Sequence, residues 1–99
     1  MTECTVTIRN PLGMHARAAA KFVHTAGRFA AHIRVIRGVR EMDGKSVMGL
    51  LLLGASHGST IRITADGHDE DEAMTALCQL VDRGFDEVPL DGALDGSCV

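Results

Sequence analysis

Two basic side chains stand two positions apart in the stretch GMHARAAAKFV, which covers residues 13–23. His15 and Arg17 lie where a polar, glycine-containing segment changes to the alanine-rich pattern of a helix. The free N–H groups in the first turn of a helix attract anions, and an arginine adds donors that match phosphate oxygens. A neutral histidine can attack phosphorus with a ring nitrogen. The pattern therefore indicates a site where His15 accepts a phosphoryl group and Arg17 holds it.

The same pair also has an ordinary explanation. His15 can simply begin a helix and Arg17 can be a solvated side chain, because such a pair often occurs by chance. Gly13 permits a close backbone approach just before the helix. We expect small side chains on this helix to leave room for a partner's surface, namely Ala16, Ala18 and Ala20. The remaining histidines have no comparable setting and are expected at the surface: His24, His32, His57 and His68.

Ser46 is a second residue that could carry chemistry. It follows the turn formed by Asp43 and Gly44 and precedes the apolar run VMGLLLLG, so it is a candidate N-cap of a short helix that ends at Gly54. A helix this short cannot bury every apolar residue that it carries. We therefore expect an apolar docking surface beside His15, formed by Ala20, Val47, Met48 and Leu51. The alternative is that these apolar residues all belong to the core.

Period-two alternation predicts the strands, and helical spacing predicts the helices that position these residues. Strands are expected over residues 4–9, 31–37, 39–42 and 60–66. Helices are expected over residues 16–26, 47–53 and 69–83. The apolar face of the first helix would be Ala16, Ala19, Ala20, Phe22, Val23 and Ala26. One-sided strands in this order predict an α+β fold, in which one face of a four-stranded antiparallel sheet is covered by helices.

The bulk composition excludes several classes of protein. A chain of 99 residues is expected to form one domain, and its 45% hydrophobic and 23% charged residues are ordinary for a globular protein. The net charge of -3 and the lack of Trp and Tyr argue against nucleic-acid binding, and no apolar run is long enough to span a membrane. Three cysteines without metal-ligand spacing suggest neither a disulfide framework nor a zinc site: Cys4, Cys78 and Cys98. We expect a cytoplasmic protein in a reducing compartment.

Three stretches together resemble the HPr family, the histidine-containing phosphocarrier proteins of the bacterial phosphoenolpyruvate-dependent phosphotransferase system. NPLGMHARAAAKFV resembles the family's active-site stretch, and MDGKSVMGLLLLGAS resembles its regulatory-serine stretch. GSTIRITADGHDEDEA resembles its last strand and helix. The resemblance covers about residues 4–85, and two motifs at the same separation are more specific than either alone.

The resemblance implies a phosphoryl carrier rather than an enzyme. His15 would be phosphorylated by enzyme I, which takes the group from phosphoenolpyruvate, and would pass it to an A-type acceptor domain, with Arg17 holding the phosphate. Ser46 would be the site of HPr kinase/phosphorylase. The family's fold is an open-faced β-sandwich with the order βαββαβα, and its members work as monomers. The chain itself gives no reason to expect a metal or an organic cofactor. Residues 1–85 would form this domain, and residues 86–99 would be a flexible tail.

One departure from the family and two other functions bear on this interpretation. Many members carry a proline directly after the active-site arginine, whereas this chain has Ala18, which we expect to alter the dynamics of the loop more than its chemistry. A regulatory relative would act through Ser46 alone. An acylphosphatase-like hydrolase would need a phosphate-cradling loop and a water-positioning asparagine, and Asn10 is the only asparagine.

Overall fold

The computed structural model describes residues 1–86, which form one sheet and three α-helices. The strands are β1 (Thr2–Thr7), β2 (His32–Arg37), β3 (Arg40–Asp43) and β4 (Thr60–Asp66). The helices are α1 (Ala16–Ala26), α2 (Val47–Leu53) and α3 (Glu70–Asp82), followed by a 3-10 turn, η1 (Gly84–Asp86). Of the tail expected over residues 86–99, only Asp86 lies within the described residues.

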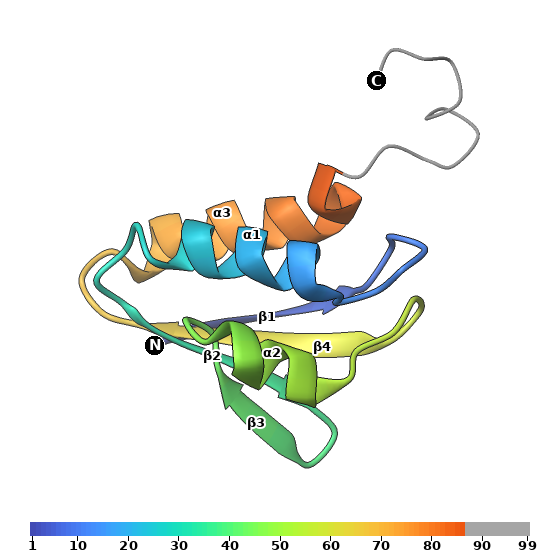
Figure 1. Cartoon of the computed structure of the whole chain (residues 1–99). Helices are drawn as coiled ribbons and strands as arrows, with labels where there is room; N and C mark the ends of the chain where they lie inside the picture. The colour runs from blue at the N-terminus through green and yellow to red at the C-terminus, as the bar shows by residue number, and fades with distance from the viewer. Residues whose placement is uncertain (87–99) are drawn as a thin grey trace.

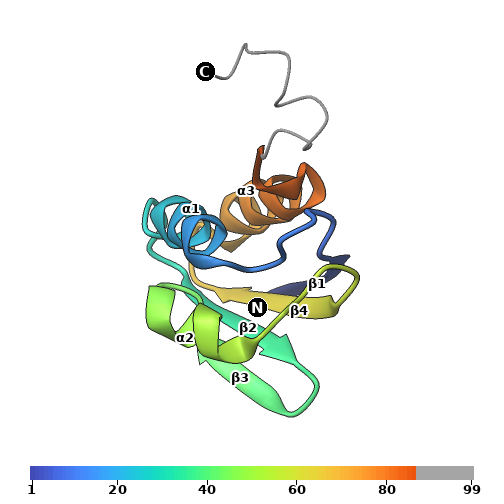
Figure 2. The same ribbon diagram turned by 45° about the vertical axis from the view of Figure 1, so that its right-hand side comes forward.

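The strands form one antiparallel sheet in the order β1-β4-β2-β3. All three helices lie on the same face of this sheet, with α1 and α3 side by side (Figure 1). α3 packs over β1 and β4, whereas α2 packs over β3 and β2 (Figure 2). This arrangement confirms the predicted α+β open-faced sandwich and its element order. No helix within residues 1–86 is long and apolar enough to cross a membrane.

The first strand begins and ends earlier than the predicted range of residues 4–9. β1 pairs with β4 from Thr2 opposite Ala65 to Thr7 opposite Thr60, where β4 begins. The partner strand therefore sets the bounds, which the alternation of one strand cannot show. The alternation itself is correct, because Ile8 is fully buried and its backbone still bonds to residues 58 and 59.

The buried face of α1 differs from the predicted one. Ala16 and Ala20 are exposed, and the buried residues are Ala18, Ala19, Phe22 and Ala26. The large Phe22 ring orients the helix, while alanines fit either face and give little periodic signal. The expectation that Ala18 leaves room for a partner is therefore wrong, since its side chain lies in the core.

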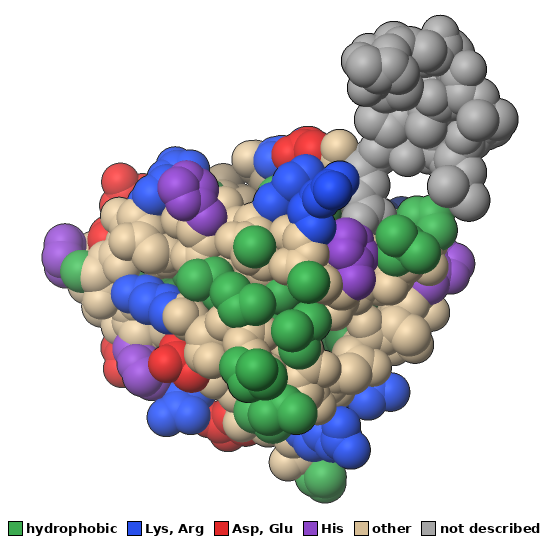
Figure 3. Space-filling view, viewed as in Figure 1, with side chains coloured by type: hydrophobic (Ala, Val, Ile, Leu, Met, Phe, Trp, Pro, Cys, Tyr) green, Lys and Arg blue, Asp and Glu red, His purple; other side chains and the backbone are tan. Residues whose placement is uncertain are grey.

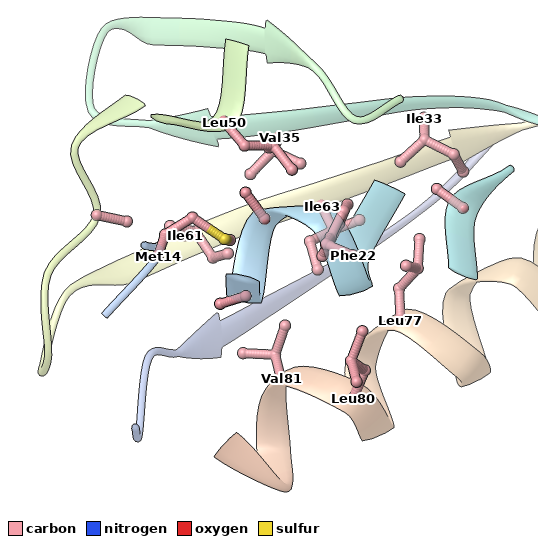
Figure 4. Packing of buried hydrophobic residues seen from close by; sticks show 14 of the residues in the cluster. Met14, Phe22, Ile33, Val35, Leu50, Ile61, Ile63, Leu77, Leu80 and Val81 are labelled. Carbon is pink, nitrogen blue, oxygen red and sulfur yellow. The ribbon is translucent and has the colours of Figure 1, made fainter. Parts of the chain in front are cut away.

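The core lies between the sheet and the helices (Figure 4). Phe22 from α1, Ile63 from β4 and Leu77 from α3 meet in its centre, and all three are fully buried. Leu50 of α2 packs beside Val35 of β2, which fixes α2 on the sheet. Burying each such side chain stabilises the fold by about 1.5–3 kcal/mol. The beginnings of α1 and α2 are thus anchored to a rigid support.

Candidate functional site

His15 occupies the N-cap of α1. Its backbone is extended (φ -86°, ψ -179°), and its carbonyl oxygen accepts the first helical bond from the Ala19 N–H at 2.8 Å. Its half-buried side chain turns back to the helix, where Nδ1 accepts a hydrogen bond from the Arg17 backbone N–H at 3.3 Å. An imidazole nitrogen that accepts a hydrogen bond carries its lone pair there. The lone pair of Nδ1 therefore points at the first turn of the helix.

The loop before His15 is pressed against the loop after α2. Gly13 has φ +71°, and a Cβ at this position would lie 2.8 Å from the carbonyl oxygen of Ala55 and from Cα of Ser56. The Met14 N–H donates to the same carbonyl of Ala55 at 2.8 Å. Only glycine fits this close approach. The expected role of Gly13 is confirmed, and the start of α1 is held by the segment that follows α2.

Asn10 fixes the peptide group that holds the histidine backbone. Its side-chain Nδ2 donates to the Gly13 carbonyl oxygen at 2.6 Å, and the same oxygen accepts the His15 N–H at 2.9 Å. Asn10 is only 2% exposed, and its Oδ1 is buried without a hydrogen-bond partner among residues 1–86. A buried acceptor without a partner costs free energy. The hydrogen bond from Nδ2, which positions the loop, therefore comes with a loss of stability at Oδ1. This role was not predicted, because the only signal for it in the sequence is a lone asparagine after a strand.

Arg17 lies in the first turn of α1 with an exposed side chain. It borders a surface hollow of about 360 Å³ whose other polar lining includes Lys21, His24, Arg83 and Asp86. Lys21 Nζ donates to the Phe85 carbonyl oxygen at 2.7 Å, and Arg83 is ion-paired with Asp86 at 2.8 Å. Basic groups outnumber acidic ones in this hollow. The surface of α1 around Arg17 and Lys21 therefore favours an anionic ligand or partner.

Ser46 is the N-cap of α2, as predicted. Its backbone is extended (φ -121°, ψ 115°), and its Oγ accepts a hydrogen bond from the Gly49 N–H at 3.0 Å. Its carbonyl oxygen accepts the Leu50 N–H at 3.0 Å. The helix ends at Gly54, whose φ is +70°. The local geometry of Ser46 is thus fully accounted for by helix capping.

Exposed and half-buried apolar side chains of α2, together with the exposed Ala20 of α1, form the surface that we call the docking surface after the expectation above: Ala20, Val47, Met48, Leu51 and Leu52. Met48 is 65%, Leu52 58% and Leu51 37% exposed, whereas Val47 is half-buried against the core. Hydrophobic side chains gather over α1 and α2, bordered by histidine, basic and acidic side chains (Figure 3). The expectation that some residues of this helix face solvent is confirmed. The exposure of Leu52 was not predicted, because a run of four leucines does not show which of them is buried.

The other histidines lie as predicted. All four have exposed side chains. Within residues 1–86 no group of three or more His, Cys, Asp or Glu side chains is placed to hold a metal ion.

Comparison with known proteins places this geometry in a family. The family model described as "PTS HPr component phosphorylation site" matches residues 2–83. The chain is 46% identical over 88 residues to the phosphocarrier protein HPr of Pseudomonas aeruginosa, which covers 88% of this chain and 98% of the relative. Among solved structures, HPr-C-His from Thermoanaerobacter tengcongensis superposes with a TM-score of 0.85 at 42% identity, over 88% of this chain and 98% of that one. A structure described as an HPr dimer from the same organism gives a TM-score of 0.71 at 42% identity, over 88% and 100% of the two chains.

The family model and the relative from Pseudomonas aeruginosa each match most of the chain, and the identity to that relative is 46%. The relatives are phosphocarrier proteins rather than enzymes. The chain belongs to the HPr family of phosphocarrier proteins of the phosphotransferase system.

Proposed function

We propose that His15 is the phosphoryl acceptor of this carrier, and that enzyme I is the donor and an A-type domain the recipient. The observation that carries this assignment is the hydrogen bond from the Arg17 N–H to Nδ1 of His15 at the start of α1. It places a nucleophilic lone pair at the end of a helix where backbone N–H groups and positive charge favour a phosphate. Nδ1 is the nitrogen that attacks.

The transfer follows from this geometry. The Nδ1 lone pair attacks phosphorus, and the bond between phosphorus and the donor breaks with its electron pair on the donor. The Arg17 N–H, which now donates to Nδ1, is then released to a phosphate oxygen. The exposed Arg17 guanidinium adds a second set of donors to the same group. Delivery to the acceptor reverses these steps, so the protein carries the group without net reaction of its own.

The docking surface and the hollow beside Arg17 indicate the chemistry of the partners that we propose. Ala20, Val47, Met48 and Leu51 supply apolar area, and Leu52 extends it. Arg17 and Lys21 supply positive charge on the adjoining helix. An apolar patch beside a basic rim fits a partner with an apolar centre and acidic edges. Enzyme I and the A-type acceptor would use this surface in turn.

We propose further that Ser46 is the target of HPr kinase/phosphorylase. The hydroxyl is half-buried at the start of α2, with Val47 and Met48 next to it in the docking surface. A phosphate oxygen can accept the hydrogen bond that the Gly49 N–H now donates to Oγ, so α2 should persist. The phosphate would also place about two negative charges beside the docking surface. Incubation with the kinase and ATP should add an acid-stable phosphate to the wild type and none to Ser46→Ala.

One experiment tests the carrier assignment directly. Purified protein is incubated with enzyme I and phosphoenolpyruvate, and phosphate is read by intact mass before and after acid treatment. We expect one acid-labile phosphate on the wild type and none on His15→Ala. His24→Ala is the matched control, because His24 is an exposed histidine on the same helix and should leave phosphorylation unchanged. Absence of phosphate on the wild type would instead favour a regulatory protein that acts through Ser46.

The proposed carrier is monomeric and cytoplasmic. Cys4 and Cys78 are free cysteines, which is consistent with a compartment that keeps thiols reduced. One related structure is described as a dimer, so the oligomeric state needs a direct measurement. Light scattering on a sizing column should give the mass of one chain, and cell fractionation should place the protein in the soluble cytoplasmic fraction.

A further inference from the structure

The hairpin of β2 and β3 brings two arginines together at one edge of the sheet. Its turn consists of Gly38, whose φ is +61°, and Val39, so Arg37 is paired directly with Arg40 across the hairpin. Like charges directly opposite each other destabilise an antiparallel pair of strands. Within residues 1–86, neither arginine takes part in an ion pair. The described fold therefore holds two neighbouring positive charges at this turn and supplies no carboxylate to neutralise them.

Both guanidinium groups turn toward the C-terminal end of α2. Arg37 Nη1 donates to the Leu53 carbonyl oxygen at 3.4 Å, and Arg40 Nη1 donates to the Leu52 carbonyl oxygen at 3.0 Å. A Cβ on Gly54 would lie 3.6 Å from Nη1 of Arg40 and 4.0 Å from Nη1 of Arg37. A guanidinium has five N–H donors, so these bonds leave donors on both groups for another acceptor. The end of α2 thus holds two guanidinium groups close to one point.

Exposed apolar side chains lie beside the two arginines. Val39 is fully exposed at the tip of the turn, and Leu52, whose carbonyl oxygen binds Arg40, is 58% exposed. Leu52 belongs to the docking surface, so this surface continues from α2 to the hairpin. The turn lies at the same end of the sheet as the end of α2 (Figure 1), and basic side chains border the hydrophobic ones there (Figure 3). A free inorganic anion would leave these apolar side chains in water, whereas a protein partner would cover them.

We propose that Arg37 and Arg40 form a second anion site, which binds carboxylate side chains of a protein partner seated on α2. This assignment rests on the proposed function, because enzyme I is the partner that it concerns. Arginine suits such a site, since its planar donors match both oxygens of a carboxylate. Arg17 lies at the start of α1, so two separate elements supply positive charge beside the docking surface.

The like-charged pair makes a binding role distinguishable from a structural one. A carboxylate at position 40 would face Arg37 across the hairpin, and opposite charges at this spacing stabilise a pair of strands. Arg40→Glu should therefore fold at least as well as the wild type, although it loses the hydrogen bond to Leu52. A pair that serves a partner should lose affinity in the same variant. Binding is thus expected to weaken without a loss of stability.

The experiment measures the melting temperature of the full chain and its affinity for purified enzyme I by calorimetric titration. We expect Arg40→Glu to weaken binding by about 10-fold or more, while its melting temperature is unchanged or rises by up to about 5 °C. Arg62→Glu is the matched control, because Arg62 is exposed between the buried Ile61 and Ile63 and so lies on the face of the sheet away from the helices. Salt screens a charge at that distance, so the control should change the affinity by less than about twofold.

A second probe needs no enzyme I and so separates this site from the carrier assignment. A short peptide of alternating Glu and Leu is added to isotope-labelled protein, and the guanidinium resonances are followed by NMR. We expect saturable shifts for Arg37 and Arg40 and none for Arg62. Inorganic phosphate at the same concentration should shift them less, because it cannot cover the neighbouring apolar side chains.

Three results would overturn the proposal: Arg40→Glu binds enzyme I as tightly as the wild type, the peptide leaves the resonances of both hairpin arginines unchanged, or phosphate shifts them more than the peptide does. Absence of an acid-labile phosphate on His15 would refute the carrier assignment, but it would not alter the response of these arginines to the peptide.

Discussion

The starts of α1 and α2 have the same local construction with different residues. In each, the residue before the helix has an extended backbone and a side-chain acceptor that takes an N–H of the first turn. Ser46 Oγ accepts the Gly49 N–H at 3.0 Å, and His15 Nδ1 accepts the Arg17 N–H at 3.3 Å. Serine is among the best residues at this position, and histidine is not among the preferred ones. Capping thus explains Ser46 but does not explain His15.

The surroundings differ in the same way. The loop before α1 is held by the buried Asn10 amide and by Gly13 against the segment after α2. The turn before α2 is fixed too, because the buried Gly44 donates its N–H to the Ile33 carbonyl oxygen at 2.8 Å and a Cβ there would collide with the Ile33 side chain. Within residues 1–86, a costly buried acceptor and a weak capping residue occur together at the start of α1, whereas the start of α2 has neither. This combination is typical of a site kept for chemistry rather than for stability.

The largest expected effect comes from adding a methyl group to the tight loop. Gly13→Ala should lower the free energy of unfolding by about 2–4 kcal/mol, because it combines a positive φ with a Cβ in contact with backbone atoms of the 55–56 segment. Gly49→Ala in α2 is the comparison, since the added Cβ would lie 3.3 Å or more from its neighbours. We expect it to change stability by no more than about 1 kcal/mol. Urea unfolding curves measure both, and equal losses would contradict the proposed strictness of the α1 start.

The next effect concerns the guanidinium at the site. Arg17→Ala keeps the backbone N–H that binds Nδ1 and removes only the side-chain donors, so transfer from enzyme I should slow by about 30-fold or more. Arg17→Lys should restore part of the rate, because it keeps the charge without the planar donor set. Arg9→Ala is the control, since Arg9 is an exposed arginine paired with Asp82 at 3.0 Å. Stopped-flow or quenched transfer kinetics that show equal rates for Arg17→Ala and Arg9→Ala would refute the role of Arg17.

A smaller effect separates charge from capping at Ser46. Ser46→Asp and Ser46→Asn both supply a good N-cap, but only the aspartate places a negative charge beside the docking surface. We expect Ser46→Asp to raise the KM for enzyme I by about 10-fold, and Ser46→Asn to leave it near the wild-type value. Both should keep the helical content seen by circular dichroism. If the two variants transfer at the same rate, the proposed electrostatic mechanism of regulation fails.

The smallest effect is at the start of α3, where the carboxylate of the N-cap residue Asp69 accepts hydrogen bonds from the segment before β2. The backbone N–H groups of Ala30 and Ala31 hold the pKa of Asp69 below its ordinary value of 3.8. Because the folded pKa is lowered, this contribution to stability is present above pH 4 or so and is lost as pH falls through the folded pKa. Asp69→Asn should therefore melt at a lower temperature at neutral pH and show a shallower loss on acidification. Parallel pH dependences of melting for the two proteins would show that Asp69 contributes nothing.

Local patterns predicted much of this molecule. The alternation in residues 60–66 matches β4, and the alanine-rich spacing begins at Ala16 as α1 does. Ser46 and Gly54 were predicted as the cap and end of α2 because capping is a local property of the chain. His15 and Arg17 could be put forward as candidates for the same reason, since their spacing and the helix start are adjacent in sequence.

The errors concern contacts between distant segments. β1 ends where its partner strand begins, and the last helix begins at Glu70 rather than at Asp69, whose carboxylate binds amides nearly forty positions away. Asn10 acts through a loop whose shape depends on residues that follow α2. The face of α1 was wrong because alanines give a weak signal and Phe22 decides the orientation. These features depend on pairing and packing between segments that are distant in sequence. The local periodicity of a single sequence does not reveal such contacts.

The most direct test replaces the histidine with the better capping residue. His15→Ser and the wild type are compared by urea unfolding and by phosphorylation with enzyme I and phosphoenolpyruvate. We predict that the variant is at least as stable as the wild type, by up to about 1 kcal/mol, and carries no acid-labile phosphate. A variant that still accepts such a phosphate, or a variant whose loss of phosphate is accompanied by a loss of stability, would contradict the claim that His15 is kept for phosphoryl transfer.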